Sequence, residues 1–192
     1  ALELPGLTVS GERMADKAAA KQLKETCRGA NVTIKKVECK EKSEKPPALY
    51  DLTALQRDAN RLLGFTAQQT LDYLQSLYEK KLCTYPRTDS RYLTGDMADS
   101  LPELVNLVAS AMPFRKGIAI TYDPQTVIND KKVTDHHAVI PTRNLKDADL
   151  SALPAGEKAV LELVALRLLC AVAQPHIYSE TVVIAACAGG EF

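Results

Sequence analysis

Two kinds of hydrophobic pattern follow one another along this chain, a helical pattern in the middle and strand-like patterns towards the ends. In residues 52–63, 66–79 and 155–173, apolar side chains recur every three or four positions, as they do on one face of an α-helix. The segments Val32–Val37 and Ile177–Ile184 are instead rich in β-branched residues, which is typical of strands. We therefore expect an α+β fold in which a mainly helical middle is inserted between β-rich segments.

Residues typical of helix ends occur at the boundaries of the predicted helices. Gly64 follows the first helical stretch and fits the position just past a helix end. Thr66 and Gln69 have the spacing of a capping box, which opens a second helix. On the apolar side of that helix we expect Leu71, Leu74, Leu77 and Tyr78. The tight turn between the two helices fits a helix-turn-helix or an ordinary αα-corner, and the sequence leaves both open.

The remaining segments complete a division into three parts. A short strand is expected around Leu7–Val9, a helix over Ala15–Cys27, another helix over 101–111, and strand and loop over 113–135. The Val32–Val37 strand should end in a charged, solvated run to Lys45, and Pro46-Pro47 then breaks any regular element. The expected parts are residues 1–45, residues 46–174 with the longest helix at the centre of the core, and residues 175–192 as returning strands.

Charge and cysteine content narrow the functional classes. Lys and Arg together number 24, as do Asp and Glu, so the formal net charge is zero and bulk positive charge would not hold nucleic acid. The five scattered cysteines include no C-x-x-C pair, which argues against zinc and against a disulfide framework. No apolar run approaches the roughly 20 residues of a membrane span, and no signal peptide opens the chain. We expect reduced thiols, no membrane partner and a cytoplasmic location.

The stretch Thr84–Leu93 contains the strongest candidate for catalytic chemistry. A tyrosine hydroxyl is a weak nucleophile unless nearby cations stabilise the phenolate, and Arg87 stands two residues after Tyr85. The guanidinium fork matches two phosphoryl oxygens. Pro86 would keep both residues out of a continuing helix. By its residues alone, the same stretch is also compatible with an ordinary surface turn.

A second candidate is Thr134–Thr142, which contains adjacent histidines. In a strand, His136 and His137 would point to opposite faces, so only one of them is expected to enter a site. A surface histidine beside a core histidine would give the same pattern. A zinc site is poorly supported, because the chain has only three histidines.

Taken in order, these motifs resemble those of the type IA DNA topoisomerases. The two histidine- and tyrosine-bearing forms, Tyr85–Tyr92 and Asp135–Thr142, are more similar to topoisomerase III than to topoisomerase I. The motifs that carry the family resemblance are Pro46–Gln56, Gly64–Ala67, Leu77–Lys80 and Thr84–Leu93. The resemblance implies a helical, tyrosine-bearing domain of the helix-turn-helix or CAP-like kind, inserted between segments of a β-rich hinge or arch.

The family also implies roles for individual residues. Tyr85 matches the tyrosine that attacks single-stranded DNA and becomes linked to the 5′-phosphate, and Arg87 matches the arginine that stabilises the scissile phosphate. His136 matches a histidine that helps order the site, and Asp89 an acid placed to orient that histidine. Three further residues are expected to contact the neighbouring DNA backbone, namely Thr88, Ser90 and Arg91.

One part of the family pattern is missing from the chain. Type IA enzymes use a Toprim domain whose Asp-x-Asp-x-Glu cluster holds Mg²⁺, and here Asp147-Ala148-Asp149 is followed by Leu150 and Ser151. The resemblance therefore implies that Mg²⁺ binds outside this chain, with no metal site within it. It implies a central gate fragment that is inactive alone, with single-stranded DNA and the Toprim and remaining domains of the parent chain as partners, working in the nucleoid.

Two other interpretations remain at this point. Asp135-His136-His137 also resembles the signature of DHH-type phosphoesterases, but no earlier aspartates supply the rest of a two-metal site. A non-enzymatic helix-turn-helix module would bind double-stranded DNA selectively, whereas a topoisomerase of this family is expected to prefer single strands.

Overall fold

The computed structural model describes residues 16–111, 122–188 and 190–192, and the chain forms two compact units. One unit joins the residues up to Ser43 with Ile177–Phe192, and the other is Glu44–His176. The strand expected around Leu7–Val9 lies outside the described residues, as do residues 113–121 of the strand and loop expected over 113–135.

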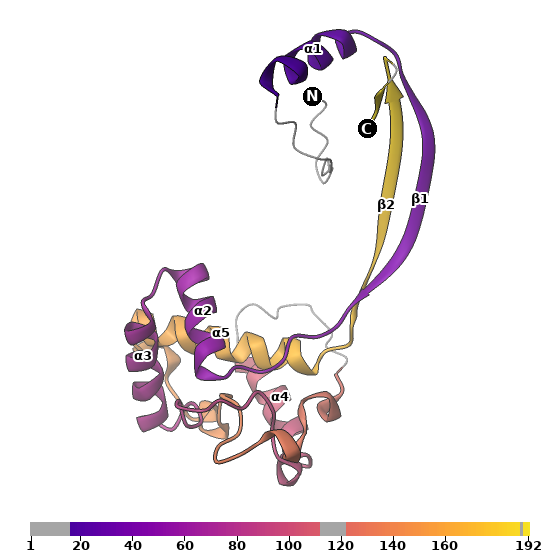
Figure 1. The fold of residues 1–192 in the computed structure, drawn as a ribbon. Helices are drawn as coiled ribbons and strands as arrows, with labels where there is room; N and C mark the ends of the chain where they lie inside the picture. Colours follow the sequence, from indigo (N-terminus) through magenta and orange to yellow (C-terminus); the bar gives the residue numbers. More distant parts are fainter. Residues whose placement is uncertain (1–15, 112–121, 189) are drawn as a thin grey trace. The chain divides into compact units, whose positions relative to one another are not determined.

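The first unit consists of one helix and a three-stranded sheet. Helix α1 (Lys17–Cys27) is capped by Asp16, whose carboxylate accepts a hydrogen bond from the Ala18 backbone. Strands β1 (Val32–Glu44) and β2 (His176–Cys187) lie side by side, and β3 (Gly190–Glu191) pairs antiparallel with β2 (Figure 1).

Strand β1 is longer than the hydrophobic pattern predicted. The charged run after Val37 is exposed, as expected, but it continues the strand to Glu44 instead of ending it. Almost every side chain of β1 is exposed, so charge does not oppose pairing of the backbone. An ion pair of 2.6 Å between Lys42 and Glu180 joins the two long strands.

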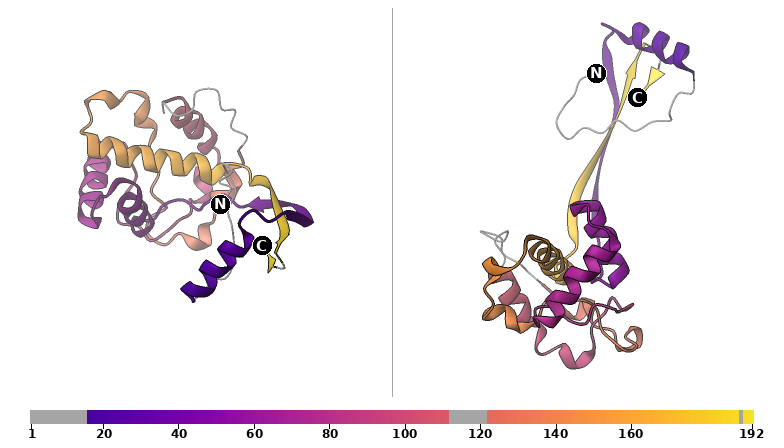
Figure 2. Two further views of the ribbon diagram at one scale, coloured as in Figure 1. Left: turned by 90° about the horizontal axis from the view of Figure 1, so that it is seen from above. Right: turned by 90° about the vertical axis from the view of Figure 1, so that its left-hand side faces the viewer.

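The second unit is a helical assembly arranged around α5. Helix α5 (Ala155–Val172) is the longest described helix and packs against α2, α3 and α4 (Figure 2), which confirms its expected place at the centre of the core. These partner helices are α2 (Leu52–Leu63), α3 (Ala67–Glu79) and α4 (Leu101–Ala111). Short 3₁₀ turns lie between them, at Gly95–Met97, Pro124–Val127, Asp130–Lys132, Arg143–Lys146 and Leu150–Ala152.

Local signals set the ends of α2 and α3 as predicted. Gly64 has a φ of 72°, in the left-handed region that glycine adopts without strain. The Thr66 hydroxyl accepts from the Gln69 backbone at 3.1 Å, while the Gln69 amide oxygen accepts from the Thr66 backbone at 2.9 Å. The capping box is therefore confirmed.

Two expectations about α3 need correction. Tyr78 was placed on the apolar side of α3, but 39% of it is exposed, and Leu71 is only half-buried. Of the strand and loop expected over 113–135, the described residues 122–135 form 3₁₀ turns with isolated bridges, because Pro124 and the Asn129-Asp130 pair favour tight turns over a ladder.

The α2–α3 pair behaves as an αα-corner. Helix α3 contains no lysine or arginine, and it packs against α5. A recognition helix needs a basic face free to enter a groove. Among the described helices, none is long and apolar enough to cross a lipid bilayer.

Candidate active site

The loop that carries Tyr85 is held between two other segments by backbone hydrogen bonds. On one side, Thr84 N donates to Ile140 O at 3.0 Å, and Thr142 N donates to Leu82 O at 3.0 Å. On the other side, Leu52 N donates to Thr88 O at 3.2 Å. Residues 82–93 are thereby fixed to residues 138–142 and to the start of α2.

The residues on both sides of Tyr85 are anchored individually. The Thr84 hydroxyl donates to Ala138 O at 3.1 Å and accepts from Ile140 N at 3.0 Å. Pro86 is buried, so its fixed φ restricts the chain from within the protein. The Tyr85 backbone has little freedom to move away from the histidine segment.

Tyr85 and His136 meet in space. Their ring centroids are 4.2 Å apart, with an interplanar angle of 35°. Tyr78 approaches Tyr85 from α3, with the ring centroids 5.5 Å apart at 84°, an edge-to-face contact. Tyr85 is half-buried and His136 is exposed, so the pair lies at the surface, where a polymer can reach it.

The segment that precedes the histidines is tied to the tyrosine loop as well. The Thr88 hydroxyl donates to the His136 carbonyl at 2.8 Å. Asp89 accepts from the Thr134 hydroxyl at 3.4 Å, two residues before His136. Asp89 thus contacts the segment that carries His136 through the Thr134 side chain. The His137 ring lies 2.9 Å from the Ala138 carbonyl and is half-buried.

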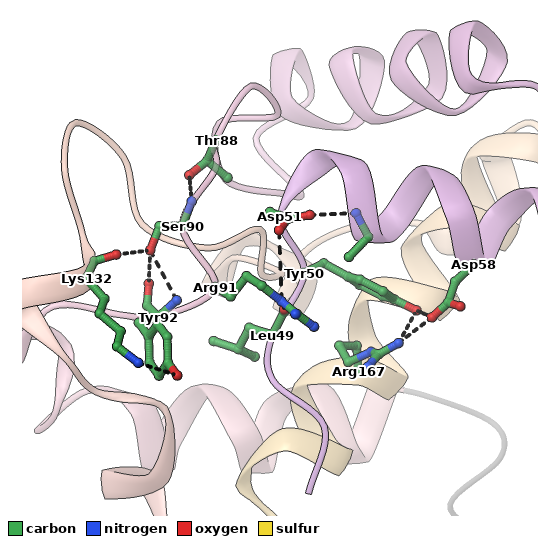
Figure 3. A network of polar contacts seen from close by, with 11 residues as sticks. Leu49, Tyr50, Asp51, Asp58, Thr88, Ser90, Arg91, Tyr92, Lys132 and Arg167 are labelled. Atoms are coloured by element: carbon green, nitrogen blue, oxygen red, sulfur yellow. Dashed lines mark hydrogen bonds and ion pairs between the residues drawn. The ribbon is translucent and has the colours of Figure 1, made fainter.

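Three of the residues expected near DNA have partners inside the protein (Figure 3). Thr88 and Ser90 are buried, and the Ser90 hydroxyl donates to Lys132 O at 2.9 Å. Arg91 Nε donates to Leu49 O at 3.1 Å. These side chains shape the loop itself, a role that the motif did not predict. Arg87, in contrast, is exposed beside Tyr85.

A partly buried polar cluster that joins α2 and α5 was also missed. The Tyr50 hydroxyl donates to Asp58 at 2.8 Å and accepts from Arg167 Nη2 at 3.0 Å, and Arg167 also bonds Asp58 (Figure 3). The Arg167 guanidinium lies 4.1 Å from the Tyr50 ring centroid, a cation–π contact. A lone arginine within the apolar pattern of α5 was the available signal.

The cluster holds Asp58 as a carboxylate. Burial by itself would raise the pKa of Asp58, but the hydrogen bonds from Tyr50 and Arg61 and the charge of Arg167 outweigh it, so the pKa lies below its usual value. Burial raises the pKa of Tyr50, so this phenol stays neutral.

The described residues do not provide a set of ligands suited to Mg²⁺. Across residues 16–111, 122–188 and 190–192, no three His, Cys, Asp or Glu side chains gather closely enough to hold a metal ion. Magnesium requires several oxygen ligands in near-octahedral positions. No chemical step is therefore assigned to a metal held by these residues.

Comparison with known proteins places the chain among DNA topoisomerases. Residues 6–192 match the family model described as DNA topoisomerase. DNA topoisomerase 3 of Shouchella clausii is 41% identical over 187 residues, which are 94% of this chain and 25% of that protein. DNA topoisomerase 3 of Bacillus subtilis is 38% identical over 180 residues, 89% of this chain and 24% of that protein.

A solved structure has the same fold. Full-length topoisomerase I from Thermotoga maritima aligns with a TM-score of 0.66 at 23% identity, covering 96% of this chain and 30% of that one. The chain spans about a quarter of the length of the curated relatives. From the family match and the order of its motifs, this chain belongs to the type IA DNA topoisomerases, on the topoisomerase III branch.

Proposed function

We propose that this chain carries the DNA-cleaving tyrosine of a type IA topoisomerase III. The Tyr85 oxygen forms a bond to a phosphorus of single-stranded DNA while the bond from that phosphorus to the 3′ oxygen breaks. The tyrosine gives up its proton, and the leaving oxygen takes one up to become a 3′-hydroxyl. The product is a 5′-phosphotyrosine, and rejoining is the reverse of this step.

The observation that supports this proposal is the contact between Tyr85 and His136. Two motifs that lie far apart in the sequence place a tyrosine and a histidine ring with centroids 4.2 Å apart, at an accessible surface. Arg87 follows on the same anchored loop and has the bidentate donor geometry that a phosphate requires. A guanidinium and an imidazole near one phosphate would stabilise the charge that develops as Tyr85 attacks.

The full reaction requires parts that the proposal places elsewhere in the parent protein. Strand passage that relaxes or decatenates DNA needs a gate that opens, and the topoisomerase 3 relatives are about four times as long as the region they share with this chain. A leaving-group acid and bound Mg²⁺ would come from a Toprim domain of the same parent chain. This chain would supply the nucleophile and the loop that positions it.

The test is a labelled-strand experiment on the full-length protein that contains this sequence. A single-stranded oligonucleotide labelled at its 3′ end should leave its label on the protein after denaturation, whereas a 5′ label should not. Tyr85→Phe should abolish the adduct, while Tyr92→Phe, a matched control from the same loop, should keep it. An adduct formed by Tyr85→Phe, or one that carries the 5′ label, would rule out the proposed step.

A further inference from the structure

A cavity of about 360 Å³ lies beside α2 and concentrates positive charge. It falls within the size range of small-ligand sites, roughly 300–1,000 Å³. The lining residues are Ala54, Arg57, Asp58, Arg61, Arg91 and Arg167. Four arginines thus face one aspartate, in a chain whose formal net charge is zero. Even when Asp51 is counted, which lies 3.9 Å from Arg91 Nε, a surplus of two positive charges remains.

Three structural elements build this cavity. Ala54, Arg57, Asp58 and Arg61 lie at positions i, i+3, i+4 and i+7 of α2, which form one face of a helix. Ala54 is buried and small, so it leaves space between the longer side chains. Arg91 comes from the tyrosine loop and Arg167 from α5 (Figure 3).

Two of the arginines are held in place by groups that leave donors unused. Among the residues that the structure describes, Arg167 bonds Tyr50 and Asp58 through Nη2, and it rests on the Tyr50 ring. Arg91 contacts Leu49 O and Asp51 through Nε. A guanidinium has five N–H donors, so both retain donors beyond these contacts. Positions fixed before a ligand arrives reduce the entropy lost on binding.

We propose that this arginine cavity binds a backbone phosphate of single-stranded DNA other than the scissile one. Arginine forks match phosphate oxygens in pairs, which suits an anion more than a neutral base. Arg91 is six residues from Tyr85, and six residues of chain span at most about 20 Å. One short bound strand can therefore reach both places. This inference rests on the proposed function, since it takes the bound strand to be DNA.

The experiment measures binding of uncleaved DNA by this 192-residue chain. Anisotropy of a fluorescent oligothymidylate is followed over a series of salt concentrations. Arg57 is exposed, so Arg57→Gln removes one cavity charge without opening the core. We expect binding to weaken about tenfold, and the slope of log K against log salt to become shallower by about 0.7. Arg57→Lys should keep the slope and lose part of the affinity.

Arg143→Gln provides the matched control. Arg143 lies in the same unit, is exposed, and pairs with Glu103 at 3.0 Å rather than lining the cavity. Its replacement should change the affinity less than twofold. The inference is wrong if Arg57→Gln weakens binding no more than Arg143→Gln does. It is also wrong if the unsubstituted chain binds no oligonucleotide at low salt.

Two further arms identify the source of the phosphate and separate this inference from the cleavage proposal. Inorganic phosphate and thymidine monophosphate should not displace the oligonucleotide better than chloride at equal ionic strength. Strong displacement would show a free-phosphate site and overturn the inference. If the full-length protein forms no tyrosine adduct while Arg57→Gln still weakens binding, the cleavage proposal is wrong and the cavity proposal is supported. An adduct together with unchanged Arg57→Gln binding would give the reverse result.

Discussion

Cys83 shows how strongly its surroundings control one side chain of the tyrosine loop. Only 2% of it is exposed, and burial raises the pKa of its thiol to about 12. In the unfolded chain a cysteine ionises near pH 8.5. The neutral thiol of the folded protein is therefore a stabilising feature at neutral pH that is lost as pH rises above about 8.5.

This shift gives a prediction about alkaline stability. Between about pH 9 and pH 11, the Cys83 contribution should fall by about 1.4 kcal/mol per pH unit, because only the unfolded state releases the proton. Urea unfolding of the unsubstituted chain and of Cys83→Ala, under reducing conditions, measures this contribution. The difference between their free energies of unfolding should shrink as pH rises. A constant difference across this range would contradict the pKa.

At the scale of elements, the start of α5 fits against α3 with no space to spare. A Cβ atom built on Gly156 would lie 2.4 Å from Cζ of Tyr73, well inside van der Waals contact. The Tyr73 ring is itself packed edge-to-face on Phe65, with centroids 5.3 Å apart, so it has little room to withdraw. Gly156 therefore sets the distance between the two helices.

Replacing this glycine should destabilise the helical unit. Gly156→Ala should lower the free energy of unfolding by about 1–3 kcal/mol through overpacking, although alanine favours helix by up to about 1 kcal/mol. Thermal or urea unfolding provides the measurement. The double variant Gly156→Ala with Tyr73→Leu should recover part of the loss, since it opens the space that the new methyl group needs. A single variant as stable as the parent would disprove the contact.

For the whole molecule, the chain presents Tyr85, the proposed nucleophile, on a loop anchored by backbone hydrogen bonds. The relatives it matches are about four times as long as the shared region. We predict that the purified 192-residue chain neither relaxes negatively supercoiled plasmid nor decatenates linked circles in the presence of Mg²⁺. Agarose-gel assays test this, with a complete topoisomerase 3 as positive control. Relaxation that depends on Tyr85 would refute the prediction.

Elements with local causes could be predicted from the amino-acid sequence. Helix α2 ends at Gly64, and α3 begins with the Thr66–Gln69 capping box, because these signals act within one turn of helix. The α+β class followed from the same short-range periodicity. The order of motifs identified the family and named Tyr85 and His136 as candidates. The hydrophobic periodicity overestimated the burial of Tyr78, because helical spacing does not show which neighbour a side chain will meet.

Contacts between residues far apart in the sequence depend on how the chain folds. The rings of Tyr85 and His136 meet because backbone hydrogen bonds fix the tyrosine loop to residues 138–142. Arg167 reaches Tyr50 across 117 positions of sequence, and no local pattern encodes such a pair. The Thr88 hydroxyl donates to the His136 carbonyl, a contact across 48 positions of sequence that the motif alone did not indicate. Hydrophobic periodicity and capping act over a few residues, whereas charge clusters and ring contacts depend on how separate elements pack.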